Sequence, residues 1–170
     1  IRNLVTKRTP WIKNKLREQS DRPITPPKEY VSGETVTYLG KNYRLKVLIG
    51  EQPSIKLRRG YVEATVTKTD IDPKNTIRSL LEHWYRSLAE KRLGEKTVRL
   101  AGVIGVNPAS VTVKNYKSRW GSCSTKGDIS YNWRIILAPH SIVDYVVVHE
   151  LCHMLEHNHS SKYWKHVERH

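Results

Sequence analysis

The sequence predicts an α+β protein, because its elements are expected in the order strands, helix, strands, helix and not as alternating βαβ units. Three observations lead to this prediction. Apolar residues alternate between residues 31 and 66, and they recur at helical spacing after Asp72. A second helix, which begins after Pro139, is apolar on almost all of its faces. A chain of 170 residues with 38% hydrophobic content can build one compact domain and is too short for two of ordinary size.

The first strands are expected between residues 31 and 66. Apolar residues alternate at Val36 and Tyr38 and again from Tyr43 to Ile49, and the glycine-containing stretch between them predicts a β-hairpin. A third strand is predicted from about Ile55 to Val66, with Gly60 as a bulge or bend within it.

A long amphipathic helix is predicted to begin at Asp72 and Pro73, which form a helix start signal. Lys91, Arg92 and Gly94 supply a basic last turn and a stop, so about five turns are expected. The apolar positions recur at three- and four-residue intervals: Ile77, Leu80, Leu81, Trp84, Tyr85 and Leu88. Strands are expected to return at 111–114 and at 129–137.

The first 28 residues predict a basic arm or linker ahead of a domain that covers residues 29–170. They carry eight Lys or Arg against Glu18 and Asp21 and close with several prolines. The formal net charge of +14 attracts polyanions, so nucleic acid bound through this arm is a candidate partner. The chain starts with Ile1 and ends inside a helix-like stretch, so trimming at both ends is expected.

Composition also predicts the setting of the protein. There is no apolar run of the roughly eighteen residues that span a bilayer, and no secretory signal, so no membrane partner is expected. Two cysteines cannot build a multi-bridge framework, which favours a reducing, cytoplasmic compartment. Cys123 and Cys152 are interpreted as small core residues, with a redox-active or inhibitory thiol near the metal as the alternative for Cys123.

The second helix carries the main functional signal. Ser141 and Asp144 are spaced as a capping box, and the residues that follow are apolar almost all round, which predicts a buried helix. Within it stand His149, Glu150 and His153. Burying these polar side chains costs free energy unless something specific satisfies them.

The spacing of these residues predicts a zinc site. His149 and His153 lie one helical turn apart, so both imidazoles point the same way and can bind one tetrahedral ion. Glu150 lies roughly 100° around the axis, where it can act as a general base on water without binding the metal. The pattern therefore predicts peptide-bond hydrolysis without a covalent intermediate.

A catalytic zinc site needs a third protein ligand, and we expect His159 to supply it. It lies six residues after His153, a spacing used when the chain leaves its helix and turns back onto the ion. His157 is the alternative if the helix continues. Glu156 stands where longer motifs of this kind have glycine, and no methionine follows, so membership of the metzincins is not expected. The candidates after the helix are His157, His159, His166 and His170.

Three stretches resemble the YgjP-like metallopeptidase family, which is related to SprT-like and WLM zincins. The resemblance implies that His149, His153 and His159 hold Zn²⁺, that Glu150 is the catalytic glutamate, and that the substrate is polypeptide. It also implies a minimal zincin-like fold in which a small, mostly antiparallel sheet packs on a buried active-site helix, beside a second long helix, with the strand 129–137 near the cleft. The stretches are RWGSCSTKGDISYNWRIILAP, DYVVVHELCHMLEHNHS and Tyr163–Trp164.

Contacts with the substrate are considered for three further residues. Asn132 and Arg134 share one face of the predicted strand and could meet a bound peptide, although a solvated face explains them equally well. Tyr163 follows the third ligand and could donate to an oxyanion, although packing is the commoner role of such a residue.

Two alternatives to a simple peptidase stay open: a nucleic-acid-associated SprT-like protease, and a zinc-binding domain without turnover.

Overall fold

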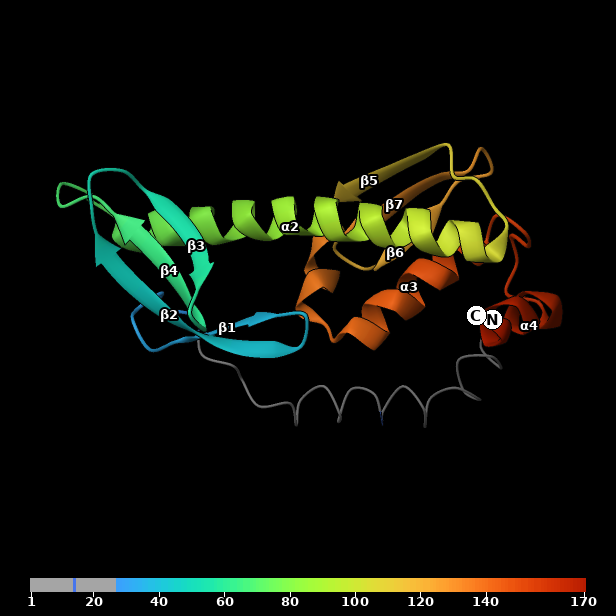
Figure 1. Cartoon of the computed structure of the whole chain (residues 1–170), viewed down its shortest axis with the longest axis horizontal. Coiled ribbons are helices and arrows are strands. Elements are labelled where there is room, and N and C mark those ends of the chain that lie inside the picture. Colours follow the sequence, from blue (N-terminus) through green and yellow to red (C-terminus); the bar gives the residue numbers. More distant parts are fainter. Residues whose placement is uncertain (1–13, 15–26) are drawn as a thin grey trace, which may run out of the picture.

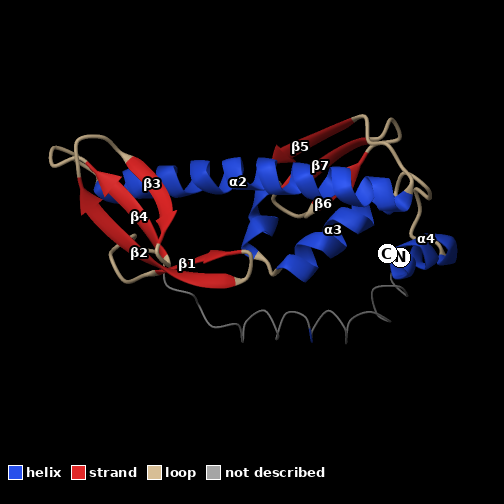
Figure 2. Cartoon of the chain, in the orientation of Figure 1, coloured by secondary structure: helices blue, strands red, loops and turns tan. Residues whose placement is uncertain are grey.

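The computed structural model describes residue 14 and residues 27–170, so nearly all of the predicted basic arm lies outside the described residues. One long helix, α2 (Pro73–Ile104), runs along most of the molecule (Figure 1). Four strands pack at the end where α2 begins, and three strands with a second helix, α3 (His140–Cys152), pack toward its other end (Figure 2). The predicted α+β class is confirmed, with two mixed sheets in place of the single sheet expected.

The first sheet has the strand order β1-β2-β4-β3. The predicted hairpin is confirmed as the antiparallel pair β1 and β2, whereas the predicted third strand is two strands, β3 and β4, joined through Arg59 and Gly60. Both joining residues have positive φ, 50° and 81°, so Gly60 belongs to a hairpin turn and not to a bulge. β2 and β4 pair in parallel. The strands are β1 (Thr35–Tyr38), β2 (Lys41–Ile49), β3 (Ser54–Arg58) and β4 (Tyr61–Val66).

Helix α2 (Pro73–Ile104) begins where the sequence predicts. It ends at Ile104, ten residues beyond the predicted stop at Gly94. The Asp72 side chain accepts a hydrogen bond from the backbone N–H of Asn75 at 3.1 Å, which caps the first turn. The predicted stop at Gly94 is wrong. Beyond it Thr97 is buried and shares a 3.0 Å hydrogen bond with Tyr131, and such packing outweighs the cost of about 1 kcal/mol for a mid-helix glycine. Gly105, with φ 82°, ends the helix.

The second sheet has the order β5-β7-β6, with β5 parallel and β6 antiparallel to the central β7. The strand predicted over residues 129–137 stops at Asn132, and the rest forms a 3₁₀ helix, η1 (Trp133–Leu137). Asn132 caps η1, because its side-chain oxygen accepts from the N–H of Arg134 at 3.2 Å. The strands are β5 (Ser110–Lys114), β6 (Gly121–Cys123) and β7 (Asp128–Asn132).

Helices α3 (His140–Cys152) and α4 (Ser161–Arg169) complete the fold. The predicted capping box is wrong: α3 begins after Pro139 without a side-chain cap, and Asp144 pairs with Lys96 of α2 at 2.5 Å. Burial of α3 is confirmed, and it packs against α2, η1, β6 and α4. Within the part of the chain that the structure describes, no helix combines the length and the apolar character needed to cross a membrane.

Candidate metal centre

Three histidines converge at the end of α3. His149 and His153 lie one turn apart, with ring centroids 5.0 Å apart, and His159 reaches them from the segment between α3 and α4. The His159 centroid is 5.1 Å from that of His149 and 4.8 Å from that of His153. One ring nitrogen from each histidine lies within 4.8 Å of the others. His157 lies beside them but does not belong to this group, because α3 does not continue far enough to turn it inward.

The ring nitrogens are arranged as metal ligands would be. Nε2 of His149 and Nε2 of His159 are 3.2 Å apart, close to the roughly 3.3 Å that two nitrogens span on a tetrahedral ion with Zn–N bonds near 2.05 Å. Nδ1 of His153 lies 3.3 Å from the Glu156 carbonyl, and in the tautomer whose Nδ1–H donates a hydrogen bond to this carbonyl, Nε2 keeps a free lone pair. The donor set therefore fits a divalent cation such as zinc.

Desolvation favours the neutral, metal-binding form of His149 and His153. Desolvation, followed by repulsion from His153 and His159, lowers the pKa of His149 to about 4. Desolvation also lowers the pKa of His153, more than its backbone contact with Glu156 raises it. Nδ1 of His149 is buried and has no hydrogen-bond partner among the described residues. His149 and His153 can therefore offer a lone pair near neutral pH.

Two aromatic residues of helix α4 pack against the histidines. Tyr163 is fully buried, its ring stacks on His153 at 4.6 Å and 27°, and its hydroxyl donates to the backbone carbonyl of His149 at 3.0 Å. Trp164 stacks on His159 at 5.8 Å and 24°. The Tyr163 hydroxyl, expected to face an oxyanion, is thus occupied by the protein backbone.

Glu150 lines a cavity of about 420 Å³ together with the three histidines and β6. Its side chain is 5% exposed, and burial raises the pKa of its carboxyl to about 7, while the positive charge of Arg119 acts in the opposite direction. Gly121 lies directly against it: a Cβ at that position would be 2.5 Å from Oε1 of Glu150. Only glycine permits this approach, a constraint that the sequence did not reveal by itself.

Asn132 has a structural position instead of the expected substrate-facing one. It is 4% exposed, and its amide nitrogen donates to the carbonyls of Tyr116 at 3.0 Å and Arg119 at 3.1 Å. Its backbone N–H donates to the Trp120 carbonyl at 2.8 Å. Asn132 therefore holds the turn that leads into β6. It is β6, and not the strand expected over 129–137, that lines the cavity.

The two cysteines differ in their surroundings. Cys152 is fully buried in the core, as expected. Cys123 is half-buried and lines the cavity beside Glu150. Burial, followed by the negative charges of Glu150 and Asp128, raises the pKa of its thiol, so Cys123 is not an activated nucleophile.

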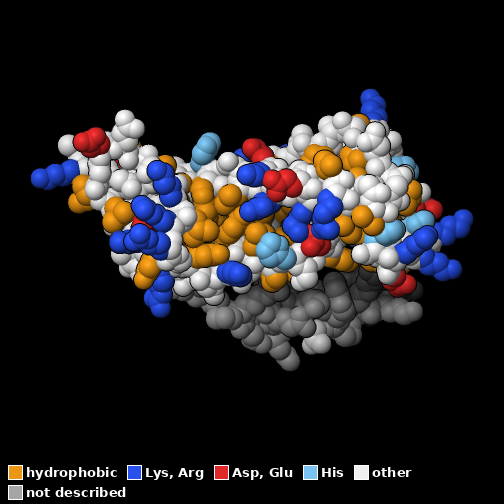
Figure 3. Space-filling view, viewed as in Figure 1, with side chains coloured by type: hydrophobic (Ala, Val, Ile, Leu, Met, Phe, Trp, Pro, Cys, Tyr) orange, Lys and Arg blue, Asp and Glu red, His pale blue; other side chains and the backbone are white. Residues whose placement is uncertain are grey.

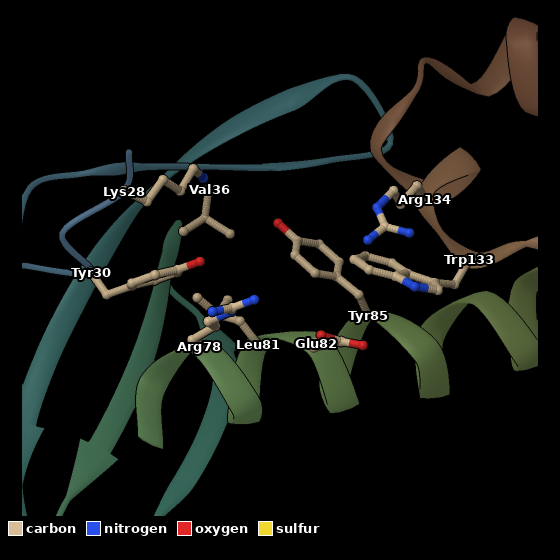
Figure 4. Close-up of a pocket in the computed structure, with 9 residues that line it drawn as sticks. All are labelled: Lys28, Tyr30, Val36, Arg78, Leu81, Glu82, Tyr85, Trp133 and Arg134. Carbon is tan, nitrogen blue, oxygen red and sulfur yellow. The ribbon is translucent and has the colours of Figure 1, made fainter. Parts of the chain in front are cut away.

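A second cavity, of about 270 Å³, lies between α2, η1 and the segment before β1 (Figure 4). None of the three grouped histidines lines it. Figure 4 shows Arg134 beside the indole of Trp133, with the guanidinium carbon 4.5 Å from the ring centroid. Tyr85 also lines this cavity and donates to the carbonyl of Thr37 at 2.8 Å. This second cavity is therefore separate from the group of three histidines.

Lys and Arg side chains are spread from one end of the visible face to the other and are not gathered over one element (Figure 3).

Comparison with known proteins places the chain in a family. A family model described as "YgjP-like, metallopeptidase domain" matches residues 1–170. Among solved structures, the chain is similar to the metallopeptidase zymogen of Pyrococcus abyssi abylysin, with a TM-score of 0.42 and 22% sequence identity. That similarity covers 45% of this chain and 77% of the abylysin chain. No curated protein is significantly similar to the chain in sequence.

Proposed function

Because the chain belongs to the YgjP-like metallopeptidase family, we propose that it hydrolyses peptide bonds with zinc held by His149, His153 and His159 and with Glu150 as general base. The convergence of three imidazoles beside a buried carboxyl group is the observation that supports this proposal most strongly. Three imidazoles are a common protein ligand set for catalytic zinc and leave a fourth position open. A zinc ion bound there supplies a Lewis acid that polarises a peptide carbonyl and makes water more acidic.

Glu150 has the position and the proton affinity that a general base needs. It lines the same cavity as the histidines, and its pKa of about 7 matches neutral pH, where a base accepts and returns a proton most effectively. In the proposed reaction its carboxylate accepts the proton of the attacking water. The carboxylic acid then delivers that proton to the amine that leaves, so Glu150 regains its starting state.

Strand β6 offers a way to hold an extended substrate. It is an edge strand, because among the described residues only β7 pairs with it. Its residues line the cavity next to Glu150. A peptide that adds to this free edge gains backbone hydrogen bonds that do not depend on its side chains. Because Gly121 has no side chain, the Glu150 carboxyl group lies directly against β6, where such a peptide would bind.

Glu150→Gln tests the proposed function. We expect this variant to bind one zinc per chain and to lose about 10²- to 10⁴-fold in kcat on an unfolded polypeptide substrate. Glu168→Gln, which removes an exposed carboxylate on α4, is the matched control and should keep full activity. Unchanged activity of Glu150→Gln rejects it as the base. A zinc-loaded wild-type protein that cleaves no polypeptide favours a binding domain without turnover.

The nucleic-acid alternative depends on the basic arm. The net charge of +14 supports it, and a gel shift on duplex DNA and on RNA at low salt tests it. Binding that weakens steeply with salt and disappears when residues 1–28 are deleted supports the alternative. Equal binding without those residues rejects the arm as the contact.

A further inference from the structure

A basic cavity lies next to the metal centre. It has a volume of about 510 Å³, and three of its residues, Lys117, Arg119 and Arg134, carry positive charge. No carboxylate is found among its lining residues, all of which belong to the described part of the chain. The remaining lining residues are neutral: Asn115, Tyr116, Ser118, Trp120 and Asn132.

This basic cavity adjoins Glu150 through the chain itself. Arg119 and Trp120 immediately precede Gly121, the residue that lies against the Glu150 carboxyl. Gly121 is also the first residue of β6. A peptide paired antiparallel with β6 runs from Cys123 toward Gly121, so its C-terminal side reaches the basic cavity.

Neighbouring groups position the two arginine side chains of this cavity. Asn132 fixes the turn that carries Arg119 through the two carbonyl contacts described above. The Arg119 guanidinium lies 5.5 Å from the Tyr116 ring centroid. Arg134 donates to the side-chain oxygen of Asn115 and lies over the ring of Trp133 (Figure 4). Guanidinium groups positioned in this way lose little conformational entropy when they bind an anion.

We propose that the basic cavity is a substrate subsite for a carboxylate on the C-terminal side of the bond that is cut. The carboxylate comes either from an Asp or Glu side chain or from the C-terminus of the peptide, because both present the same planar group to an arginine fork. Trp120, which is 55% exposed, adds an apolar wall for the stem of that residue. The inference rests on the proposed peptidase function.

Quenched fluorescent peptides of one sequence test the subsite with zinc-loaded protein. They carry Glu or Gln at each of the first three positions after the cleaved bond, and end in a free acid or an amide. We expect kcat/KM to be about 10-fold or more higher for an acidic peptide than for its neutral partner, the effect of one charge-assisted hydrogen bond. The position that shows this preference distinguishes a side-chain carboxylate from a C-terminal one.

Arginine variants assign the preference to the basic cavity. Arg119→Gln and Arg134→Gln should each bring the ratio of acidic to neutral kcat/KM close to one, and Lys117→Gln should lower it less. Arg58→Gln removes an exposed arginine on β3 and should leave the ratio unchanged. Equal rates on acidic and neutral peptides in the wild type overturn the proposal, as does a preference that survives both arginine variants.

A binding measurement separates the subsite from catalysis. The same peptides are titrated into zinc-loaded Glu150→Gln protein, with tryptophan fluorescence as the signal. If the wild type cleaves nothing, the proposed function fails, but acid-selective binding that Arg119→Gln abolishes still supports the subsite. Equal affinity for acidic and neutral peptides overturns it.

Discussion

The hydroxyl of Tyr163 donates a 3.0 Å hydrogen bond to the backbone carbonyl of His149, across the contact between α4 and the last turn of α3. The same tyrosine stacks on His153. A residue that follows all three histidines in sequence thus fixes the backbone of the first and the ring of the second. We infer that α4 orients the metal ligands and does not take part in the chemistry directly.

Tyr163→Phe should weaken zinc binding more than it slows turnover. The change leaves a buried carbonyl without its donor, so we expect the free energy of unfolding to fall by about 1 kcal/mol and zinc affinity to fall about 10-fold. Tyr145→Phe, at a residue that is 45% exposed, is the control. Competition with a chromophoric chelator measures the affinity. A large loss of kcat at saturating zinc with normal affinity would instead identify Tyr163 as an oxyanion donor.

His159→Ala and His157→Ala should differ in metal binding. Only His159 belongs to the converging group, so its removal leaves two ligands and should abolish the rise in Tm that zinc causes in chelator-treated protein. His157→Ala should keep both the rise in Tm and one zinc per chain by elemental analysis. The reverse result would mean that His157 is the third ligand.

Gly121→Ala should disable the site without releasing the metal. The added methyl group would lie 2.5 Å from Oε1 and 2.8 Å from Cδ of Glu150, so the carboxylate must move away from the cavity. We expect kcat to fall by about 10²-fold, as when a general base is misplaced, with zinc content unchanged. Gly102→Ala is the control, because nothing lies within 4 Å of its added Cβ. Normal kcat in Gly121→Ala would show that Glu150 tolerates the displacement.

Gly94→Ala should stabilise the protein, because α2 continues through this residue and an added Cβ meets nothing within 4 Å. We expect the free energy of unfolding in urea to rise by about 0.5–1 kcal/mol. Gly105→Ala should do the opposite, since its φ of 82° suits glycine alone. Destabilisation by Gly94→Ala would mean that the helix ends there, as its sequence suggests.

The stability of metal-free protein should depend on pH through Glu150. The folded protein keeps this carboxyl protonated up to about pH 7, whereas an ordinary glutamate with a pKa of 4.5 loses its proton earlier, so the contribution of Glu150 to stability falls between these values. Glu150→Gln removes this loss. Its free energy of unfolding relative to wild type should therefore rise between pH 4.5 and pH 7, by an amount on the order of 3 kcal/mol.

Urea titrations in the presence of a chelator measure this difference. His149, whose pKa is lowered, destabilises the folded state as pH falls below 6.5, but it does so in both proteins and cancels from the comparison. A difference that does not change with pH would show that the pKa of Glu150 is not raised in the folded protein.

Local spacing in the sequence was sufficient to predict the elements that carry the site. A helix that is apolar almost all round and carries polar residues at 149, 150 and 153 indicates a shared ligand, and a histidine six residues later can turn back toward them. The structure brings these three histidines together as expected. The family resemblance and the α+β class are confirmed as well.

Contacts between distant segments decided the rest. Periodicity states which face of an element is apolar, but not which neighbour that face meets, so the packing of Thr97 on Tyr131 carries α2 past Gly94 against the local signal. From the sequence, Tyr163 and Asn132 were candidates for contacts with the substrate. In the structure both side chains instead donate hydrogen bonds to backbone carbonyls of distant residues. The order of residues along the chain thus determined the ligand types of the candidate metal centre, while tertiary packing determined which surfaces lie beside it, because only folding brings Gly121 against Glu150.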